Sequence, residues 1–172
     1  MFVTGWTLNY IAHNLIVYYN KIMPAKPCTT SNAMLLLDNQ LCFALYSTSL
    51  AMTNVYKPLL GELGLTYPQY LAMLVLWERD RLMVSELGQK LYLDSGTLTP
   101  LLKRLEASGY ISRIRDVEDE RRVYVTLTSS GRKLKARAAK IPGCILSASQ
   151  CSIPELMNLT SQIQALRKQL VA

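Results

Sequence analysis

The sequence contains few of the residues from which metal sites are usually built. Its 172 residues include one histidine, His13, and four cysteines, of which no two form a CxxC pair. A structural zinc site takes four such ligands at short spacings, so we predict that the protein binds no metal and uses no cofactor. The missing CxxC pair also argues against a thiol peroxidase, because such a pair would recycle the oxidised thiol, and we expect no enzyme.

Long apolar runs are absent as well. No stretch reaches 18 consecutive apolar residues, so we expect no segment to span a membrane. The moderately apolar residues 1–21 lack a cationic start and a clear small-residue cleavage site, which argues against a secretory signal. We therefore expect a cytoplasmic protein with reduced thiols.

The composition is basic and rich in hydrophobic residues. Hydrophobic residues make up 50% of the chain, enough for a core or an oligomer interface, and the length fits one domain. The formal net charge of +7 suits an anionic partner such as nucleic acid. Residues 1–33 end in a breaker-rich stretch, Pro24–Asn32, and we expect them to form an arm that is flexible or non-native.

The segment Leu91–Gly131 has the pattern of a helix followed by a charged hairpin. Asp94 and Ser95 favour a helix start, and Gly109 favours its end. Four leucines recur between them at helical spacing and predict one apolar face: Leu98, Leu101, Leu102 and Leu105. Two β-rich runs follow, separated by the charged residues 116–120: Tyr110–Arg115 and Arg121–Thr128.

A second short helix precedes this segment. The pattern predicts a helix over Val84–Leu91, joined by a short turn to a helix over Ser95–Ser108, which is the arrangement of a helix-turn-helix. A helix fits the major groove of DNA and a hairpin tip reaches the minor groove, so we predict a winged helix-turn-helix that binds double-stranded DNA. Short polar side chains suit base edges and cations suit phosphates, and the second helix offers both kinds: Ser95, Thr97, Thr99, Lys103 and Arg104.

Apolar helices are expected on both sides of this module. Before it, we predict a long, mostly buried helix over Leu35–Leu60 that bends or breaks near Pro58, and a helix over Tyr67–Arg79 capped by Thr66. Leu37, Leu41, Leu45 and Met52 form the apolar set of the long helix.

After the hairpin, we predict a helix that begins at Thr128 or Ser129 and runs to about Lys140. Its basic residues are expected to form a solvated face that can add phosphate contacts: Arg132, Lys133, Lys135 and Arg137. A last helix is capped by Ser152, and its apolar stripe is Leu156, Leu159, Ile163, Leu166 and Leu170.

Terminal helices of this kind commonly pair with those of a second copy. We therefore expect a homodimer of mostly α-helical chains, each with a small β-hairpin wing at about residues 110–128. Residues 34–66 and 141–172 would form the dimerisation region, and residues 67–140 the DNA-binding lobe. Such a dimer would match a pseudo-palindromic operator. The alternative is that the terminal helices complete the core of one chain.

A cysteine in the long helix has two interpretations. Cys42 lies among apolar residues, where a lone cysteine is usually a small core residue. A reactive role would need phenolic hydroxyls that hydrogen-bond its thiolate, and several tyrosines follow in the sequence: Tyr46, Tyr56, Tyr67 and Tyr70.

Several runs resemble the MarR family of bacterial transcription regulators. The segment Asp119–Gly131 fits the wing pattern of that family, D-x-R, five residues, L-T and then a glycine. Within the family, the runs LDNQLCFALYS at Leu37–Ser47 and LTYPQYLAMLVLWE at Leu65–Glu78 resemble the organic hydroperoxide resistance regulators, called OhrR. The resemblance covers about Leu37 to Leu170.

This resemblance implies a dimeric repressor that leaves its operator when an organic hydroperoxide oxidises one cysteine. Cys42 stands at the position of the reactive thiol, and Tyr56 and Tyr67 stand where tyrosines of the partner subunit hydrogen-bond it. Tyr46 is expected nearby. The family also implies that Arg121 enters the minor groove and that Asp119 orients it.

One branch of the family resolves the oxidised thiol with a cysteine of the partner subunit, and the other uses a small cellular thiol. Cys144 and Cys151 both lie in the region that supplies the resolving cysteine, which favours the first branch, and either could serve. Cys28 lies in the arm, and we assign it no role. A different mechanism also stays open, in which a small aromatic ligand relieves repression and Cys42 is structural.

Overall fold

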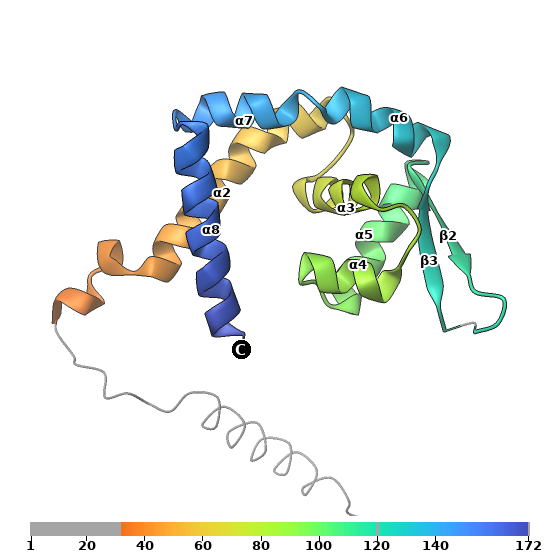
Figure 1. The fold of residues 1–172 in the computed structure, drawn as a ribbon, viewed down its shortest axis with the longest axis horizontal. Helices are drawn as coiled ribbons and strands as arrows, with labels where there is room; N and C mark the ends of the chain where they lie inside the picture. Colours follow the sequence, from red (N-terminus) through yellow and green to blue (C-terminus); the bar gives the residue numbers. More distant parts are fainter. Residues whose placement is uncertain (1–31, 120, 172) are drawn as a thin grey trace, which may run out of the picture. The chain divides into compact units, whose positions relative to one another are not determined.

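The computed structural model describes residues 32–119 and 121–171 of the chain, so most of the expected arm, with His13 and Cys28, lies outside the described residues. Figure 1 shows the arrangement. The elements in chain order are the 3-10 turns η1 (Asn32–Leu35) and η2 (Leu37–Asn39), then α2 (Leu41–Gly61), α3 (Tyr67–Glu78), β1 (Leu82–Met83), α4 (Val84–Leu91), α5 (Ser95–Ala107), β2 (Ile111–Arg115), β3 (Val123–Leu127), α6 (Ser129–Ala138), α7 (Ile141–Ser149) and α8 (Ile153–Leu170).

The chain divides into two compact units, residues 1–46 and residues 47–172. In the described part of the first unit, the two 3-10 turns precede the beginning of α2. The second unit holds the rest of α2, the helices α3 to α8 and the three strands. Among the described residues, none of the helices has the length and apolar character needed to cross a bilayer.

The helix-turn-helix and its wing form as the sequence predicted. α4 and α5 have the expected bounds, with α5 ending one residue early, and β2 and β3 pair in antiparallel register with Ile111 opposite Leu127. β1 adds a third strand on the other side of β3, which gives the order β1-β3-β2. The predicted fold class, mostly helical with a β-hairpin wing, is confirmed.

The predicted helix starts are confirmed by local hydrogen bonds. The Thr66 N–H donates to Gln69 Oε1 (2.8 Å) at the start of α3, and the Thr97 N–H donates to Asp94 Oδ1 (2.9 Å) at the start of α5. Ser152 Oγ accepts a hydrogen bond from the Glu155 N–H (3.4 Å) at the start of α8. These side chains satisfy N–H groups that have no partner within the helix.

The first long helix differs from its prediction in three ways. α2 begins at Leu41 rather than Leu35, and it runs through Pro58 without a break to Gly61. It is also not mostly buried within one chain, because Leu41 and Tyr46 are exposed and Met52 is half-buried. An apolar repeat shows that a helix face is suited to contact, but it does not say whether the same chain or another chain supplies that contact.

The core of the second unit lies between α3, α4, α5 and the sheet. The four leucines of α5 are all buried, as predicted, with exposed fractions between 0% and 8%. They pack with other large apolar side chains, among them Met73, Leu76, Leu87, Ile111 and Val125. By contrast, the stripe of α8 is exposed at Leu159, Ile163 and Leu170, so this helix does not complete the core of one chain.

Asp80, just after α3, connects three elements of this unit. Its Oδ1 accepts hydrogen bonds from the N–H groups of Arg81 (2.8 Å) and Leu127 (2.9 Å), and its Oδ2 pairs with Arg132 of α6 (2.8 Å). Burial alone would raise the pKa of Asp80, but these hydrogen bonds outweigh it and hold the pKa below its ordinary value of 3.8. Nearby, α6 approaches the base of the wing closely at Gly131. A Cβ at this position would overlap the carbonyl oxygen of Tyr110, so only glycine fits there.

We expect Asp80→Asn to lower the free energy of unfolding at neutral pH by about 1–2 kcal/mol, a small value because the carboxylate is partly exposed. Because the folded pKa lies below 3.8, the contribution of the carboxylate is fully present above that value. It is lost as the pH falls through the folded pKa. Urea unfolding at one protein concentration should therefore show a difference between variant and wild type that shrinks below about pH 4.

The matched control is Glu78→Gln, which removes an exposed carboxylate 3.8 Å from Lys90 and should change stability little at either pH. A difference for Asp80→Asn that stays constant from neutral to acid pH would show that the ionised carboxylate is not the source of the stabilisation.

Candidate functional site

The exposed face of α5 carries all the polar residues that the sequence singled out. The leucines are buried on one side of the helix, and the five polar residues are exposed: Ser95, Thr97, Thr99, Lys103 and Arg104. The Thr97 hydroxyl donates to Asp94 Oδ2 (2.9 Å), so this residue has only acceptor capacity left for a DNA base. The backbone and side-chain hydrogen bonds from Thr97 lower the pKa of Asp94 and keep it charged. Contact of these residues with DNA stays a prediction.

The wing presents an arginine that is held by a carboxylate. Arg121 is 93% exposed, and both its Nε and its backbone N–H donate to Asp119 Oδ1 at 3.1 Å. These hydrogen bonds, with the nearby charge of Arg122, lower the pKa of Asp119. The expected pairing of Asp119 with Arg121 is therefore present, and it reduces the freedom of a side chain that points into solvent.

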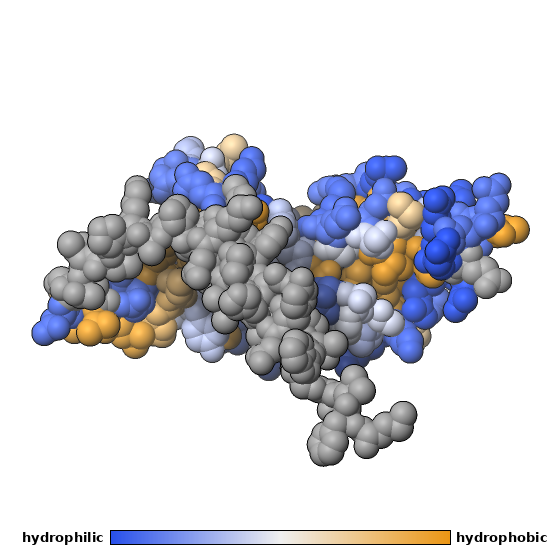
Figure 2. All heavy atoms as spheres, turned by 90° about the horizontal axis from the view of Figure 1, so that it is seen from below, coloured by the Kyte–Doolittle hydropathy of each residue, from blue (hydrophilic) through white to orange (hydrophobic). Residues whose placement is uncertain are grey.

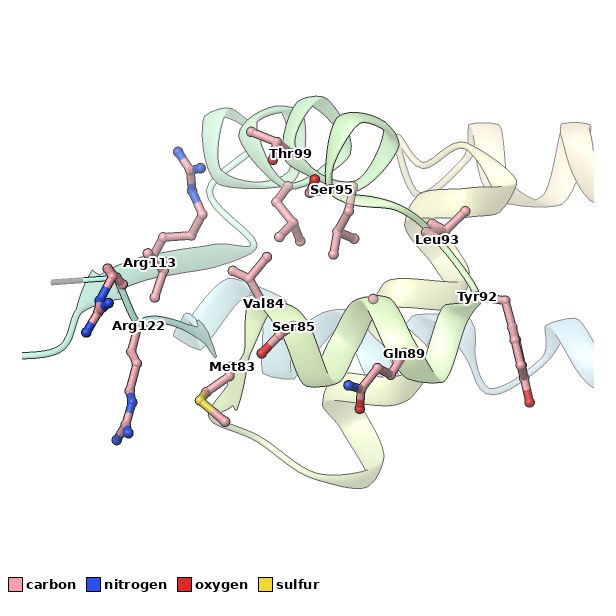
Figure 3. A pocket seen from close by; sticks show the side chains of 15 residues that line it. Met83, Val84, Ser85, Gln89, Tyr92, Leu93, Ser95, Thr99, Arg113 and Arg122 are labelled. Carbon is pink, nitrogen blue, oxygen red and sulfur yellow. The ribbon is translucent and has the colours of Figure 1, made fainter. Parts of the chain in front are cut away.

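An open groove lies between α4, α5 and the wing, with a volume of about 820 Å³ (Figure 3). In Figure 3, Ser85 and Gln89 border it from α4, and Ser95 and Thr99 border it from α5. The arginines at its wing end are Arg113, Arg121 and Arg122. The apolar floor of the groove includes Val84 and Leu93, and Figure 2 shows hydrophobic residues between polar margins on this part of the surface.

The sequence did not single out three polar residues of this groove, Ser85, Gln89 and Arg113, and it marked Arg122 only as part of the basic run Arg121–Arg122. The alternation of side chains along β2 and the position of Ser85 at the start of the first helix were signals that could have found two of them. Gln89 lies on the same face of α4 as Ser85, because residues four apart share one face of a helix, so both side chains border the groove.

The basic run of α6 is exposed, and most of its cations also bond to protein groups. Arg132 pairs with Asp80, Lys135 donates to the Trp77 carbonyl oxygen (3.1 Å), and Arg137 donates to the Glu62 carbonyl oxygen (2.6 Å). Lys140, just after the helix, pairs with the Glu62 carboxylate at 2.7 Å. These cations connect α6 to the end of α2 and the end of α3, and their side chains stay exposed, as expected for a solvated face.

Two of the expected thiolate-supporting tyrosines come together. The ring centroids of Tyr56 and Tyr67 lie 4.7 Å apart, and Tyr70 lies 6.0 Å from Tyr56. Burial raises the pKa of Tyr56 to about 12, and the neighbouring phenols of Tyr67 and Tyr70 add to this rise. Tyr56 is therefore a protonated hydrogen-bond donor at neutral pH.

The candidate redox cysteines are free, exposed thiols. Cys42 lies in the first turn of α2, in the first unit, together with the exposed Tyr46, whereas the tyrosine pair belongs to the second unit. Cys144 lies within α7, and Cys151 follows that helix and donates from its Sγ to the Ser149 carbonyl oxygen (3.3 Å). Within the described residues, no group of three His, Cys, Asp or Glu side chains is placed to hold a metal ion.

The fold and the exposed polar face of α5 define a winged helix-turn-helix transcription regulator, and comparisons with known proteins identify its family. A family model described as the transcriptional regulator SarA/Rot matches residues 54–138. The organic hydroperoxide resistance transcriptional regulator of Bacillus subtilis is 55% identical over 130 residues, which cover 76% of this chain and 88% of that protein.

Two solved structures of AbfR, a protein of Staphylococcus epidermidis, are also similar. Reduced AbfR bound to DNA is 34% identical, with a TM-score of 0.69 over 83% of this chain and 100% of that chain. Disulfide-formed AbfR is 35% identical, with a TM-score of 0.56 over 81% of this chain and 92% of that chain. The chain belongs to the MarR-type family of DNA-binding transcription regulators, not to an enzyme family, and its predicted resemblance to the OhrR branch is confirmed.

The exposed face of α5 predicts two separable kinds of DNA contact. The probe is a duplex that the wild-type protein selects from a random-sequence pool, compared with unselected duplex. We expect Thr99→Ala to weaken binding to the selected duplex about tenfold and to leave binding to unselected duplex unchanged, because it removes a base contact. Lys103→Ala should weaken both and reduce the slope of log affinity against log salt by about one, because it removes a phosphate contact.

Fluorescence anisotropy over a salt series measures both quantities, and each variant serves as the control for the other. Equal losses on selected and unselected duplex for Thr99→Ala would exclude this residue as a base contact.

Proposed function

We propose that this protein is a homodimeric, cytoplasmic repressor that senses organic hydroperoxides through Cys42 and releases a pseudo-palindromic operator when Cys42 is oxidised. The observation that carries the proposal is the 55% identity to an organic hydroperoxide resistance regulator over an alignment of 130 residues. A free cysteine in the first turn of α2 and two tyrosines in ring contact are the groups that this function needs.

The chemistry begins with the Cys42 thiolate. Its sulfur attacks the terminal oxygen of the hydroperoxide and the O–O bond breaks, so Cys42 becomes a sulfenic acid, and the leaving alkoxide takes a proton from solvent to become an alcohol. Phenols that donate hydrogen bonds to the thiolate favour the charged form, and in the proposed dimer these are Tyr56 and Tyr67 of the partner subunit. Tyr46, on the same helix as Cys42, is a third candidate. The aromatic surfaces of these rings would also favour an organic peroxide over hydrogen peroxide.

The second step is attack of another thiol on the sulfenic acid, which forms a disulfide and releases water. Cys144 and Cys151 are the candidates within the protein, because both are free and exposed. The resolving thiol would come from the partner subunit. A small cellular thiol is the alternative, and it would form a mixed disulfide with Cys42.

Disulfide formation must then lower the affinity for DNA. This chain matches reduced, DNA-bound AbfR better than disulfide-formed AbfR, with TM-scores of 0.69 and 0.56 at nearly equal sequence identity. That difference supports a rearrangement that accompanies disulfide formation in such a regulator. Tyr92 lies in the turn between α4 and α5, and the guanidinium carbon of Arg167 in α8 lies 4.4 Å from its ring centroid. Through this contact, a movement of α7 and α8 would be transmitted to α4 and α5. A coupling of about 1–3 kcal/mol is typical of allosteric proteins.

A repressor relieved by a small aromatic ligand is the second candidate. The groove beside α5 favours it, since it combines an apolar floor with arginines that could pair with an acidic group. In that case Cys42 would be a structural residue.

Replacement of Cys42 separates the two candidates. We expect Cys42→Ser to bind the selected duplex like wild type. We expect cumene hydroperoxide to release wild-type protein from this duplex but not the variant. The reason is that serine has no thiolate to attack the peroxide. Gel-shift titration with the hydroperoxide measures this effect.

Cys144→Ser and Cys151→Ser are the matched variants on non-reducing gels. A dimer-sized band that is lost in one of them alone would name the resolving cysteine. Release of Cys42→Ser by the hydroperoxide at the wild-type dose would refute the redox mechanism.

The tyrosine pair predicts an effect on rate rather than on DNA binding. We expect Tyr56→Phe to slow the reaction of Cys42 with cumene hydroperoxide by about tenfold, because one hydrogen bond to the thiolate is lost while the ring remains. Stopped-flow detection of sulfenic acid measures the rate. Tyr70→Phe is the control, since it removes a hydroxyl from the same cluster and should leave the rate near wild type. Equal slowing in both variants would show that Tyr56 has no special role.

A further inference from the structure

α5 and the wing are joined by a pair of side chains with no assigned role in DNA binding. Glu106 lies in the last turn of α5, and Arg113 is the middle residue of β2. The Arg113 backbone N–H donates to Glu106 Oε1 (3.0 Å), and its Nε donates to Oε2 (2.9 Å). Its Nη2 donates to the same Oε2, so the guanidinium grips the carboxylate with two nitrogens.

This pair differs from an ordinary surface ion pair. Both side chains are half-buried, and the hydrogen bond from the Arg113 side chain, with that from its backbone, lowers the pKa of Glu106 despite some burial. Both side-chain nitrogens donate to Oε2 while the backbone N–H donates to Oε1, so both carboxylate oxygens are held, unlike in a single flexible lysine contact. The third bond, from the backbone, attaches the strand itself to the helix.

The position of the pair along the hairpin is what makes it relevant to DNA. The base of the wing is held separately, where Leu127 donates to Asp80 and Thr128 donates to the Gly109 carbonyl oxygen (2.6 Å). Arg113 lies opposite Val125, farther along the hairpin, and therefore nearer to the tip that carries Arg121. At this level β1 holds β3 through the pairs Leu82–Val125 and Met83–Tyr124, and the Glu106–Arg113 pair holds β2 directly to α5.

We propose that Glu106 is a positioning residue that sets the distance between α5 in the major groove and Arg121 in the adjacent minor groove. The separation of neighbouring grooves in a duplex is fixed. α5 and Arg121 can therefore bind their grooves together only if the protein holds them at the matching separation. This inference rests on the DNA contacts proposed above for α5 and Arg121. It adds a residue that acts through Arg121 without touching DNA.

A double-mutant cycle between Glu106 and Arg121 tests this role. These side chains have no contact in the structure described, so variants that act independently should have additive effects on binding. We expect Glu106→Ala to weaken binding to the selected duplex about tenfold in the wild-type background and about twofold or less in the Arg121→Ala background. Binding to unselected duplex should change little, because backbone contacts do not need both readers in register.

Two controls separate positioning from folding and from charge. Glu106→Gln keeps an acceptor for the Arg113 backbone N–H and should show an intermediate loss, which gives a folded variant if the alanine variant is unstable. Glu78→Ala removes the same charge from an exposed pair with Lys90 and should have no effect on either duplex. Thermal midpoints are measured for every variant.

The outcomes distinguish the inference from its premise. Equal factors for Glu106→Ala in both backgrounds would overturn the positioning role while leaving the wing contact intact. Wild-type binding by Arg121→Ala would instead remove the wing contact, and the positioning role with it. A loss in the Glu106 variants that follows their thermal midpoints, on both duplexes alike, would show a purely structural role.

Discussion

Burial of one face of α5 is the constraint on which the DNA-binding part of this protein depends. Leu98, Leu101, Leu102 and Leu105 are all buried against α3, α4 and the sheet. Each such side chain contributes about 1.5–3 kcal/mol when it leaves water. Because the helix repeats every 3.6 residues, the same packing that buries the leucines turns Ser95, Thr99 and Lys103 outward. The packing of the leucines in the core therefore also determines which polar side chains α5 exposes.

Polar side chains then hold the other elements around this core. Asp80 connects the end of α3 to β3 and α6, and Glu106 connects α5 to β2. Several cations that the sequence offers to DNA, such as Arg132 and Arg137, also bond to protein groups while their side chains stay exposed. The basic composition of this chain therefore does not identify which cations contact phosphates. The fold adds which cations are exposed and which are already paired with protein groups.

The proposed redox site has a different character from the DNA-binding face. The tyrosine pair lies half-buried in the second unit, while Cys42, Cys144 and Cys151 are exposed. α2, which carries Cys42, and α8, which begins two residues after Cys151, also expose apolar side chains, for example Leu41 and Ile153. A site assembled across two subunits accounts for both observations, because the second chain would cover the apolar faces and supply the remaining groups. Sensing and dimerisation would then depend on the same surfaces.

Local signals in the sequence determined the fold class and most helix and strand bounds. Capping by Asp94, Thr128 and Ser152 acts within one turn, and the bounds of α4 follow from nearby residues alone. The resemblance of the run around Cys42 indicated the family. Tertiary structure decided what depends on distant partners: the Asp80–Arg132 pair, the burial of Tyr56 by Tyr67, and the exposure of α2, which the sequence had suggested would be buried. The reason is physical, since a helix repeat or a cap involves residues a few positions apart, whereas a contact between distant residues exists only after the chain has packed.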